Sequence, residues 1–76
     1  MKITPQNIKE WIEVGLPGSE AAVDGDGHHF EATVFFSGFK GKNSLARHRM
    51  VYAALGEYMR DAIHALSLKT LVPGEG

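Results

Sequence analysis

Histidines are the residues of this chain best suited to bind a metal, because its 76 residues include four histidines and no cysteine. A neutral imidazole is a common metal ligand, and it titrates close to physiological pH. His28 and His29 are adjacent and follow Gly25-Asp26-Gly27, a strong turn signal. His64 lies where a long helical pattern gives way to an alternating one. It can be a ligand, a switch or a structural residue.

His48, the fourth histidine, belongs to an apolar helical stripe between two arginines, which favours a packing role. Catalysis is not expected, because no cysteine nucleophile and no Ser–His–Asp pattern is evident. Asp24 and Asp26 lie near the paired histidines and could mimic an acid–base cluster. At an exposed turn, however, the pKa values of these carboxyls have little reason to shift. We therefore predict that the chain is not an enzyme.

The sequence of the first half of the chain predicts one helix and two strands. Thr4-Pro5 is a helix start, since threonine caps free N–H groups and proline fits the first helical position. Gly15 is expected to end this helix in a left-handed conformation. Residues 19–24 and 30–36 alternate like strands joined by a type I′ hairpin at the Asp-Gly pair. The predicted core face of the second strand carries Phe30, Ala32, Val34 and Phe36.

The second half predicts one long helix and one strand. Apolar residues recur at three- and four-residue steps over residues 44–61, capped by Asn43 or Ser44. The predicted apolar face includes Leu45, His48, Tyr52, Leu55 and Met59, and it is broadened by Val51, Ala54 and Tyr58. Gly56 interrupts this pattern, and either a kink or a close packing contact would explain it. Residues 63–72 alternate like a strand, and residues 73–76 form a polar tail.

These elements predict a single α+β domain over residues 1–76, in the order helix-strand-strand-helix-strand. The helices should cover one face of a three-stranded mixed sheet in two layers, with the last strand parallel to the second. Hydrophobic content of 43% and charged content of 22% are typical of globular proteins. The sequence has no apolar run of the ~18 residues that a membrane span needs, so we expect no membrane association and a cytoplasmic location.

Several separated motifs resemble the BolA family, over a stretch from about Val23 to Pro73. The motifs are Gly25-Asp26-Gly27 with His29-Phe30, Phe39-Lys40-Gly41-Lys42, Arg47-His48-Arg49 with Val51-Tyr52, and His64-Ala65-Leu66-Ser67-Leu68-Lys69-Thr70. The resemblance implies a KH-like fold of class II type. It also implies partnership with monothiol glutaredoxins in iron–sulfur trafficking and iron homeostasis. A regulatory, DNA-binding role is attributed to some family members.

The resemblance further implies a shared 2Fe–2S cluster. Histidine can replace cysteine on one iron, so a chain without cysteine can ligate half of such a cluster. The glutaredoxin would supply its cysteine and a bound glutathione thiol, and the isolated chain would hold no cluster. His64 matches the principal family ligand. The second ligand is expected in the loop between the first two strands, where His28 and His29 are both candidates and His29 aligns with the His-Phe motif.

Nucleic-acid binding is the alternative function. Gly38-Phe39-Lys40-Gly41 is a GxxG, the loop with which KH domains clamp a nucleic-acid backbone, although nine glycines produce such spacings by chance. The net charge of −1 means that such binding must rest on a local patch. The residues predicted to contact a partner or nucleic acid are Lys40, Gly41, Lys42, Arg47, Arg49 and Lys69. The chain is expected to be a monomer or a weak homodimer joined through an exposed sheet edge.

Overall fold

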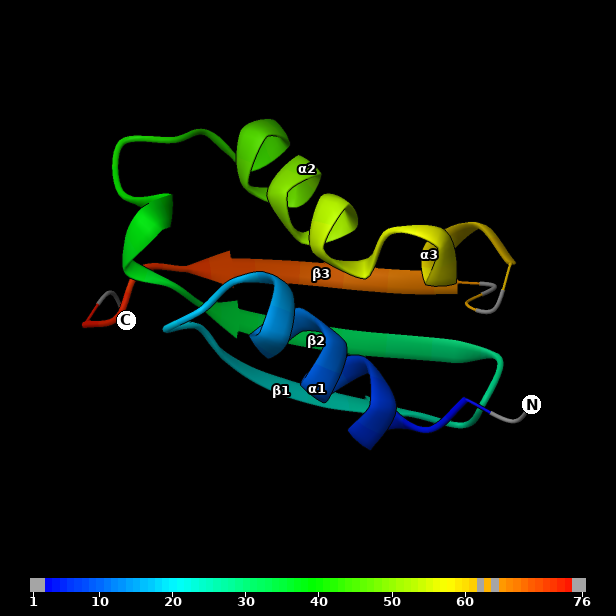
Figure 1. Ribbon diagram of the computed structural model, residues 1–76. Helices are drawn as coiled ribbons and strands as arrows, with labels where there is room; N and C mark the ends of the chain where they lie inside the picture. The colour runs from blue at the N-terminus through cyan, green and yellow to red at the C-terminus, as the bar shows by residue number, and fades with distance from the viewer. Residues whose placement is uncertain (1–2, 62, 64, 75–76) are drawn as a thin grey trace.

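The computed structural model describes residues 3–61, 63 and 65–74. Its elements are, in order, α1 (Pro5–Gly15), β1 (Glu20–Gly25), β2 (His29–Phe35), the 3-10 helix η1 (Ser37–Phe39), α2 (Ser44–Leu55), α3 (Glu57–Asp61) and β3 (Ala65–Leu71). The helices lie together on one side of the sheet (Figure 1). The predicted two-layer α+β fold and its order are therefore confirmed. No helix in the described part of the chain combines the length and apolar character needed to cross a membrane.

The sheet has the strand order β1-β2-β3. β1 pairs with β2 antiparallel, from Glu20 opposite Phe35 to Gly25 opposite Phe30. β2 pairs with β3 parallel, from His29 opposite Ala65 to Phe35 opposite Leu71. The predicted mixed sheet is confirmed, because the helical connection between β2 and β3 returns the chain in the same direction.

The start of α1 is fixed by a capping box. The Thr4 hydroxyl accepts from the Asn7 N–H at 3.2 Å, and the Asn7 side chain accepts from the Thr4 N–H at 3.1 Å. Pro5 occupies the first turn, where its missing N–H leaves no hydrogen bond unmade. Ile8 and Ile12 are fully buried one turn apart, so this helix faces the sheet as its apolar spacing predicts.

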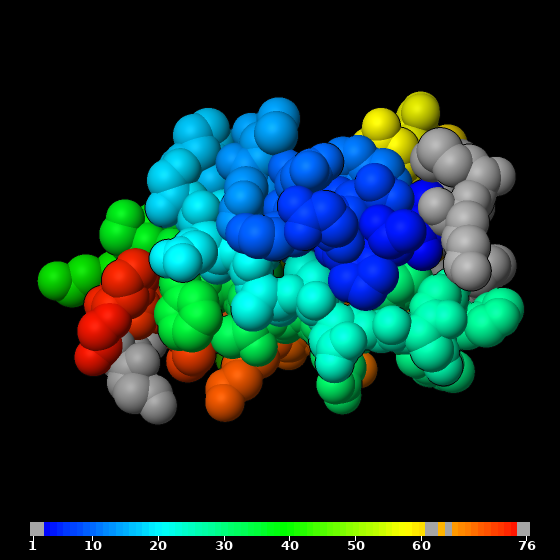
Figure 2. Space-filling view, turned by 90° about the horizontal axis from the view of Figure 1, so that it is seen from below, coloured from blue at the N-terminus to red at the C-terminus, as the bar shows by residue number. Residues whose placement is uncertain are grey.

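Two side-chain features join α1 to its neighbours. The Glu13 carboxylate accepts from the Lys9 ammonium and from the Ala21 N–H of β1, the latter at 3.0 Å. These hydrogen bonds, Lys9 first, lower the pKa of Glu13. At Gly15 an added Cβ would lie 2.6 Å from the Ala54 Cβ, so glycine permits the close approach of α1 and α2. Figure 2 shows α1 (blue) against the cyan surface of β1.

The expected left-handed conformation at Gly15 is wrong. Gly15 belongs to α1, the cap is Leu16, and the positive φ of 91° falls at Gly18 in the following turn. The glycine at position 15 is therefore explained by helix packing, while Gly18 supplies the backbone freedom that the turn requires.

The core lies between the helices and the covered face of the sheet. Phe30, Ala32 and Val34 are buried there, as predicted, while Phe36 is half-buried beyond the end of β2. The buried residues are Ile3, Ile8, Ile12, Leu16, Ala21, Phe30, Ala32, Val34, Phe39, Val51, Leu55 and Ile63. At the edge of this core, Trp11 of α1 stacks on Tyr58 of α3 with ring centroids 3.7 Å apart.

The prediction of one continuous helix over residues 44–61 is wrong. Gly56 has φ 56° and ψ −130°, and its N–H bonds to the Tyr52 carbonyl at 2.9 Å as α2 ends. A Cβ at Gly56 would meet only the Ala53 carbonyl oxygen, at 3.9 Å. Of the two explanations for this glycine, the break in the helix is correct and the close packing contact is not.

The predicted apolar face of α2 is also wrong in part. Leu45 is 60% exposed and Tyr52 is 40% exposed, whereas Val51 and Leu55 are fully buried. Apolar residues occur around most of this helix, so their spacing alone does not identify the side that packs on the sheet. His48 is half-buried, in agreement with a residue at the margin of the packed side.

The strand boundaries differ slightly from those predicted. β1 begins one residue later than expected, and β2 begins one residue earlier. β3 begins at Ala65 rather than at residue 63. The expected two-residue turn at Asp26-Gly27 is wrong, because the β1–β2 ladder ends at Gly25 and Phe30 and leaves residues 26–29 to make the connection. Gly27, with φ 99°, provides the left-handed residue of this tip.

Candidate functional site

The hairpin tip and the start of β3 lie at the same end of the sheet (Figure 1). In the β2–β3 ladder His29 is directly opposite Ala65. His28 and His29 are both exposed. His64, the predicted principal ligand, lies outside the described residues and precedes Ala65 in the sequence. The register thus brings His29 of the tip beside Ala65, the first residue of β3.

Asp26 holds the backbone of the hairpin tip. One of its carboxylate oxygens, Oδ1, accepts from the N–H of His28 and from the N–H of His29, each at 2.9 Å. The Asp26 N–H also donates to the His29 carbonyl at 3.2 Å. Two of these hydrogen bonds join the ends of the four-residue connection, at Asp26 and His29, and the third holds His28, so Asp26 fixes the backbone beneath both imidazoles.

The expectation that the carboxyls of this turn would keep ordinary pKa values is wrong for Asp26. The backbone N–H groups of His29 and His28, in that order of effect, lower the pKa of the Asp26 carboxyl. Hydrogen bonds to the ionised form favour it even in an exposed position. The tip therefore carries a carboxylate whose negative charge lies next to two potential metal ligands.

The ligands predicted at this end of the sheet are imidazoles. Imidazole nitrogen is an accepted ligand for iron in clusters in which histidine replaces cysteine. Within residues 3–61, 63 and 65–74, no three histidine, cysteine, aspartate or glutamate side chains gather as a metal site. The described histidines alone could supply only part of a coordination sphere.

The predicted contact residues Lys40, Gly41 and Lys42 lie in the exposed turn after η1. Gly41 has φ 80°, which turns the chain towards α2. Phe39, the first variable residue of the GxxG, is fully buried, and its ring packs edge-on against Phe36 with centroids 5.3 Å apart. Phe39 of this loop is thus part of the core, while Lys40, and Lys42 just after the loop, are exposed to solvent.

Arg47 connects three segments of the molecule. Its Nε donates to the Lys42 carbonyl at 2.8 Å, and its Nη1 donates to the Thr70 carbonyl of β3 at 3.3 Å. The guanidinium carbon lies 5.8 Å from the centre of the Phe39 ring. The sequence motif indicated a contact residue, but Thr70 is 23 residues from Arg47, and only the fold shows that Arg47 holds the lysine turn against β3.

The other cations are more open to solvent. Arg49 and Lys69 are exposed, on α2 and β3 respectively. Asn43 caps α2 by accepting from the Ala46 N–H at 2.9 Å, which decides between the two capping residues expected. The exposed cations nearest the start of α2 are therefore Lys40, Lys42 and Arg49.

Comparison with known proteins identifies the family. The family model described as BolA-like protein matches residues 13–75. The chain belongs to the BolA-like family. The structure of a bolA protein homologue from Coxiella burnetii is 54% identical, covers 93% of this chain and 92% of that chain, and superposes with a TM-score of 0.89.

Two curated relatives match shorter parts of their own sequences. BolA-like protein 1 from Homo sapiens is 38% identical over 58 residues, which are 76% of this chain and 42% of that protein. DNA-binding transcriptional regulator BolA from Escherichia coli (strain K12) is 39% identical over 46 residues, which are 60% of this chain and 44% of that protein. The chain spans less than half the length of these relatives.

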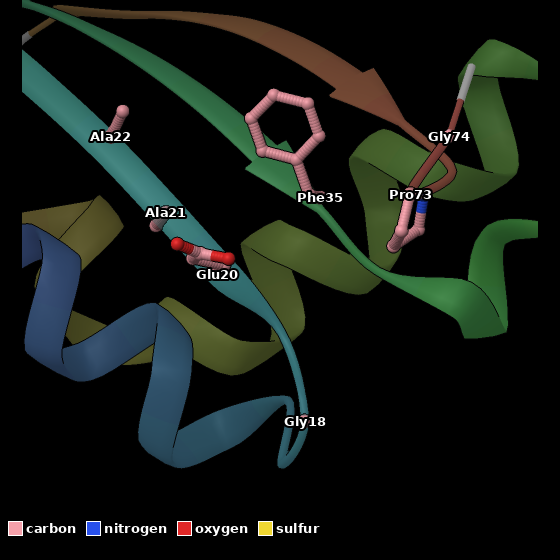
Figure 3. A pocket seen from close by; sticks show the side chains of 7 residues that line it. All are labelled: Gly18, Glu20, Ala21, Ala22, Phe35, Pro73 and Gly74. Atoms are coloured by element: carbon pink, nitrogen blue, oxygen red, sulfur yellow. The ribbon is translucent and has the colours of Figure 1, made fainter.

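This BolA-like domain also has a shallow depression at the opposite end of the β1–β2 hairpin, with a volume of about 350 Å³ (Figure 3). Phe35 and Pro73 form its apolar wall, and Glu20 contributes a carboxylate. Its remaining lining residues are Gly18, Ala21, Ala22 and Gly74. It contains no histidine, so it is separate from the paired histidines of the tip.

Proposed function

We propose that this BolA-like chain is a non-catalytic adaptor that binds a monothiol glutaredoxin and shares a 2Fe–2S cluster with it. The cluster is cargo, to be held or transferred between proteins. The observation that supports this most strongly is the β2–β3 register, which brings exposed His29 beside Ala65 in a chain whose family resemblance marks His64 as a ligand.

In this proposal each partner supplies half of the coordination. His64 and one of His28 and His29 would ligate from this chain, and the glutaredoxin cysteine and a glutathione thiol would ligate from the other side. Mixed histidine and thiolate ligation is established chemistry for 2Fe–2S clusters. A ligating imidazole must be neutral, so cluster sharing should weaken in acid.

The exposed cations are proposed as contacts for the acidic groups of the partner. Lys40, Lys42 and Arg49 are accessible, and arginine suits the paired oxygens of a carboxylate such as those of glutathione. Arg47 would act differently, by holding the lysine turn in place through the Lys42 and Thr70 carbonyls.

The test is to mix the chain with a cluster-loaded monothiol glutaredoxin and record visible absorption and circular dichroism. We expect a changed spectrum and a mixed complex in gel filtration. His64→Ala should alter this spectrum in a folded protein, and comparison of His28→Ala with His29→Ala should identify the second ligand. His48→Ala, outside the proposed site, is the control. An unchanged spectrum with no complex for the wild type would exclude this function.

DNA binding is a second candidate because the relative from Escherichia coli carries the name DNA-binding transcriptional regulator BolA. The exposed Lys40 of the GxxG and the exposed Lys42 that follows it are the residues proposed to contact phosphate. Binding should weaken steeply with salt and should be lost in the double substitution Lys40→Ala with Lys42→Ala. A probe that is not shifted at low salt, or binding that ignores salt, would remove this candidate.

A further inference from the structure

Asp26 makes contacts that the proposed ligation does not itself explain. Its single Oδ1 atom accepts from two consecutive backbone N–H groups, those of His28 and His29, both at 2.9 Å. Its own N–H donates to the His29 carbonyl at 3.2 Å. Gly27 between them has φ 99°, a conformation that lets the chain turn back on the carboxylate.

These contacts lie outside the part of the hairpin that the fold requires. The β1–β2 ladder already closes at Gly25 and Phe30, and Phe30 is anchored with only 1% of its surface exposed. Asp26 is itself exposed and contacts no core residue through these hydrogen bonds. Its carboxylate therefore orders residues 26–29, and the strands are held together without it.

The order imposed by Asp26 applies directly to the candidate ligands. A hydrogen bond at each histidine N–H restricts the backbone from which each imidazole extends, while both side chains are exposed. A site shared between two proteins gains affinity when one half is ordered before the partners meet, because less conformational entropy is lost on binding.

We propose that Asp26 is a positioning residue. Through hydrogen bonds to the backbone, and not as a ligand, it orders the His28–His29 tip before the cluster binds. This inference rests on the proposed function. The requirement is for an acceptor oxygen at this place, so asparagine should replace aspartate, whereas alanine should not. Asp24 is a matched control, because its Oδ1 accepts from the Gly25 N–H at 2.9 Å in the same hairpin, whereas both histidine N–H groups donate to Asp26.

The experiment compares wild type, Asp26→Ala, Asp26→Asn and Asp24→Ala in two measurements. The first is NMR of the isolated chain, which reports solvent exchange at the His28 and His29 N–H groups and the integrity of the core through the Val34 N–H. The second is a titration of cluster-loaded monothiol glutaredoxin, followed by visible circular dichroism. We expect Asp26→Ala to speed exchange at both histidines and to raise the concentration for half-maximal spectral change about tenfold.

Asp24→Ala should match the wild type in both measurements, and Asp26→Asn, whose neutral oxygen accepts the same bonds more weakly, should lie closer to the wild type than Asp26→Ala does. Faster exchange in Asp26→Ala together with a wild-type titration would overturn the positioning role while leaving the proposed function intact. Unchanged exchange at His28 and His29 in Asp26→Ala would overturn the inference whatever the titration shows. A wild-type chain that leaves the glutaredoxin spectrum unchanged would refute the proposed function, and the positioning role with it.

Discussion

Replacing Arg47 tests whether this arginine holds the fold together or is available to a partner. Its guanidinium bonds to the Lys42 carbonyl at 2.8 Å and to the Thr70 carbonyl at 3.3 Å, and it lies over the Phe39 ring. Hydrogen bonds from charged groups contribute about 1.5–3 kcal/mol when well buried, and a cation–π contact about 0.5–1 kcal/mol. Because Arg47 is only half-buried and its hydrogen bond to Lys42 is exposed, solvent weakens these contacts below the sum of the low ends, and we expect a loss of about 2 kcal/mol for Arg47→Ala.

The assay is urea unfolding followed by far-ultraviolet circular dichroism. With a slope of about 1 kcal/mol per molar urea for a chain of this size, the midpoint of Arg47→Ala should fall by about 2 M. Arg47→Lys should lose about half as much stability, because lysine keeps the charge without the planar fork. Arg49→Ala, an exposed neighbour on α2, is the control and should change stability by less than about 0.5 kcal/mol. Equal midpoints for Arg47→Ala and Arg49→Ala would refute this account of Arg47.

Two further substitutions test the helix break and the link between α1 and β1. Gly56→Ala should destabilise the protein by about 1–3 kcal/mol, because φ 56° with ψ −130° is strained for alanine. A urea-unfolding midpoint equal to that of the wild type would contradict this. Glu13→Gln should cost about 1 kcal/mol at pH 7. The folded-state pKa of Glu13 lies below its ordinary value of 4.5, so its ionised form stabilises the fold above pH 4.5, and this stability is lost as the pH falls through the lowered pKa. The difference between wild type and Glu13→Gln should therefore shrink in acid, and a constant difference down to pH 2 would contradict it.

The strand pattern of the sequence predicted the sheet well because its periodicity is unambiguous. In β2 the alternation of Phe30, Ala32 and Val34 leaves one possible core face, and all three are buried. In α2 the apolar residues are spread around the helix, so the sequence could not show that Val51 is buried while Tyr52 is exposed. Which side packs is decided by the neighbouring elements, and local spacing does not contain that information.

The candidate site was predictable in its residue types but not in its supporting contacts. Histidines without cysteine indicated partial ligation, and the BolA-like motifs indicated which histidines to consider. The Asp26 hydrogen bonds to His28 and His29 depend on the conformation of a four-residue tip that the Asp-Gly signal described incorrectly. The contact between Arg47 and Thr70 joins residues on different elements, so it follows from the tertiary fold alone.

The most direct test of cluster sharing is pulsed EPR of the reduced mixed complex, with the histidines of this chain labelled with ¹⁵N and the glutaredoxin unlabelled. Direct ligation predicts strong ¹⁵N hyperfine coupling that changes when His64 or the ligating histidine of the tip is replaced by alanine. A reduced cluster in a stable complex without such coupling would show that both irons are held by other ligands. That result would contradict the account.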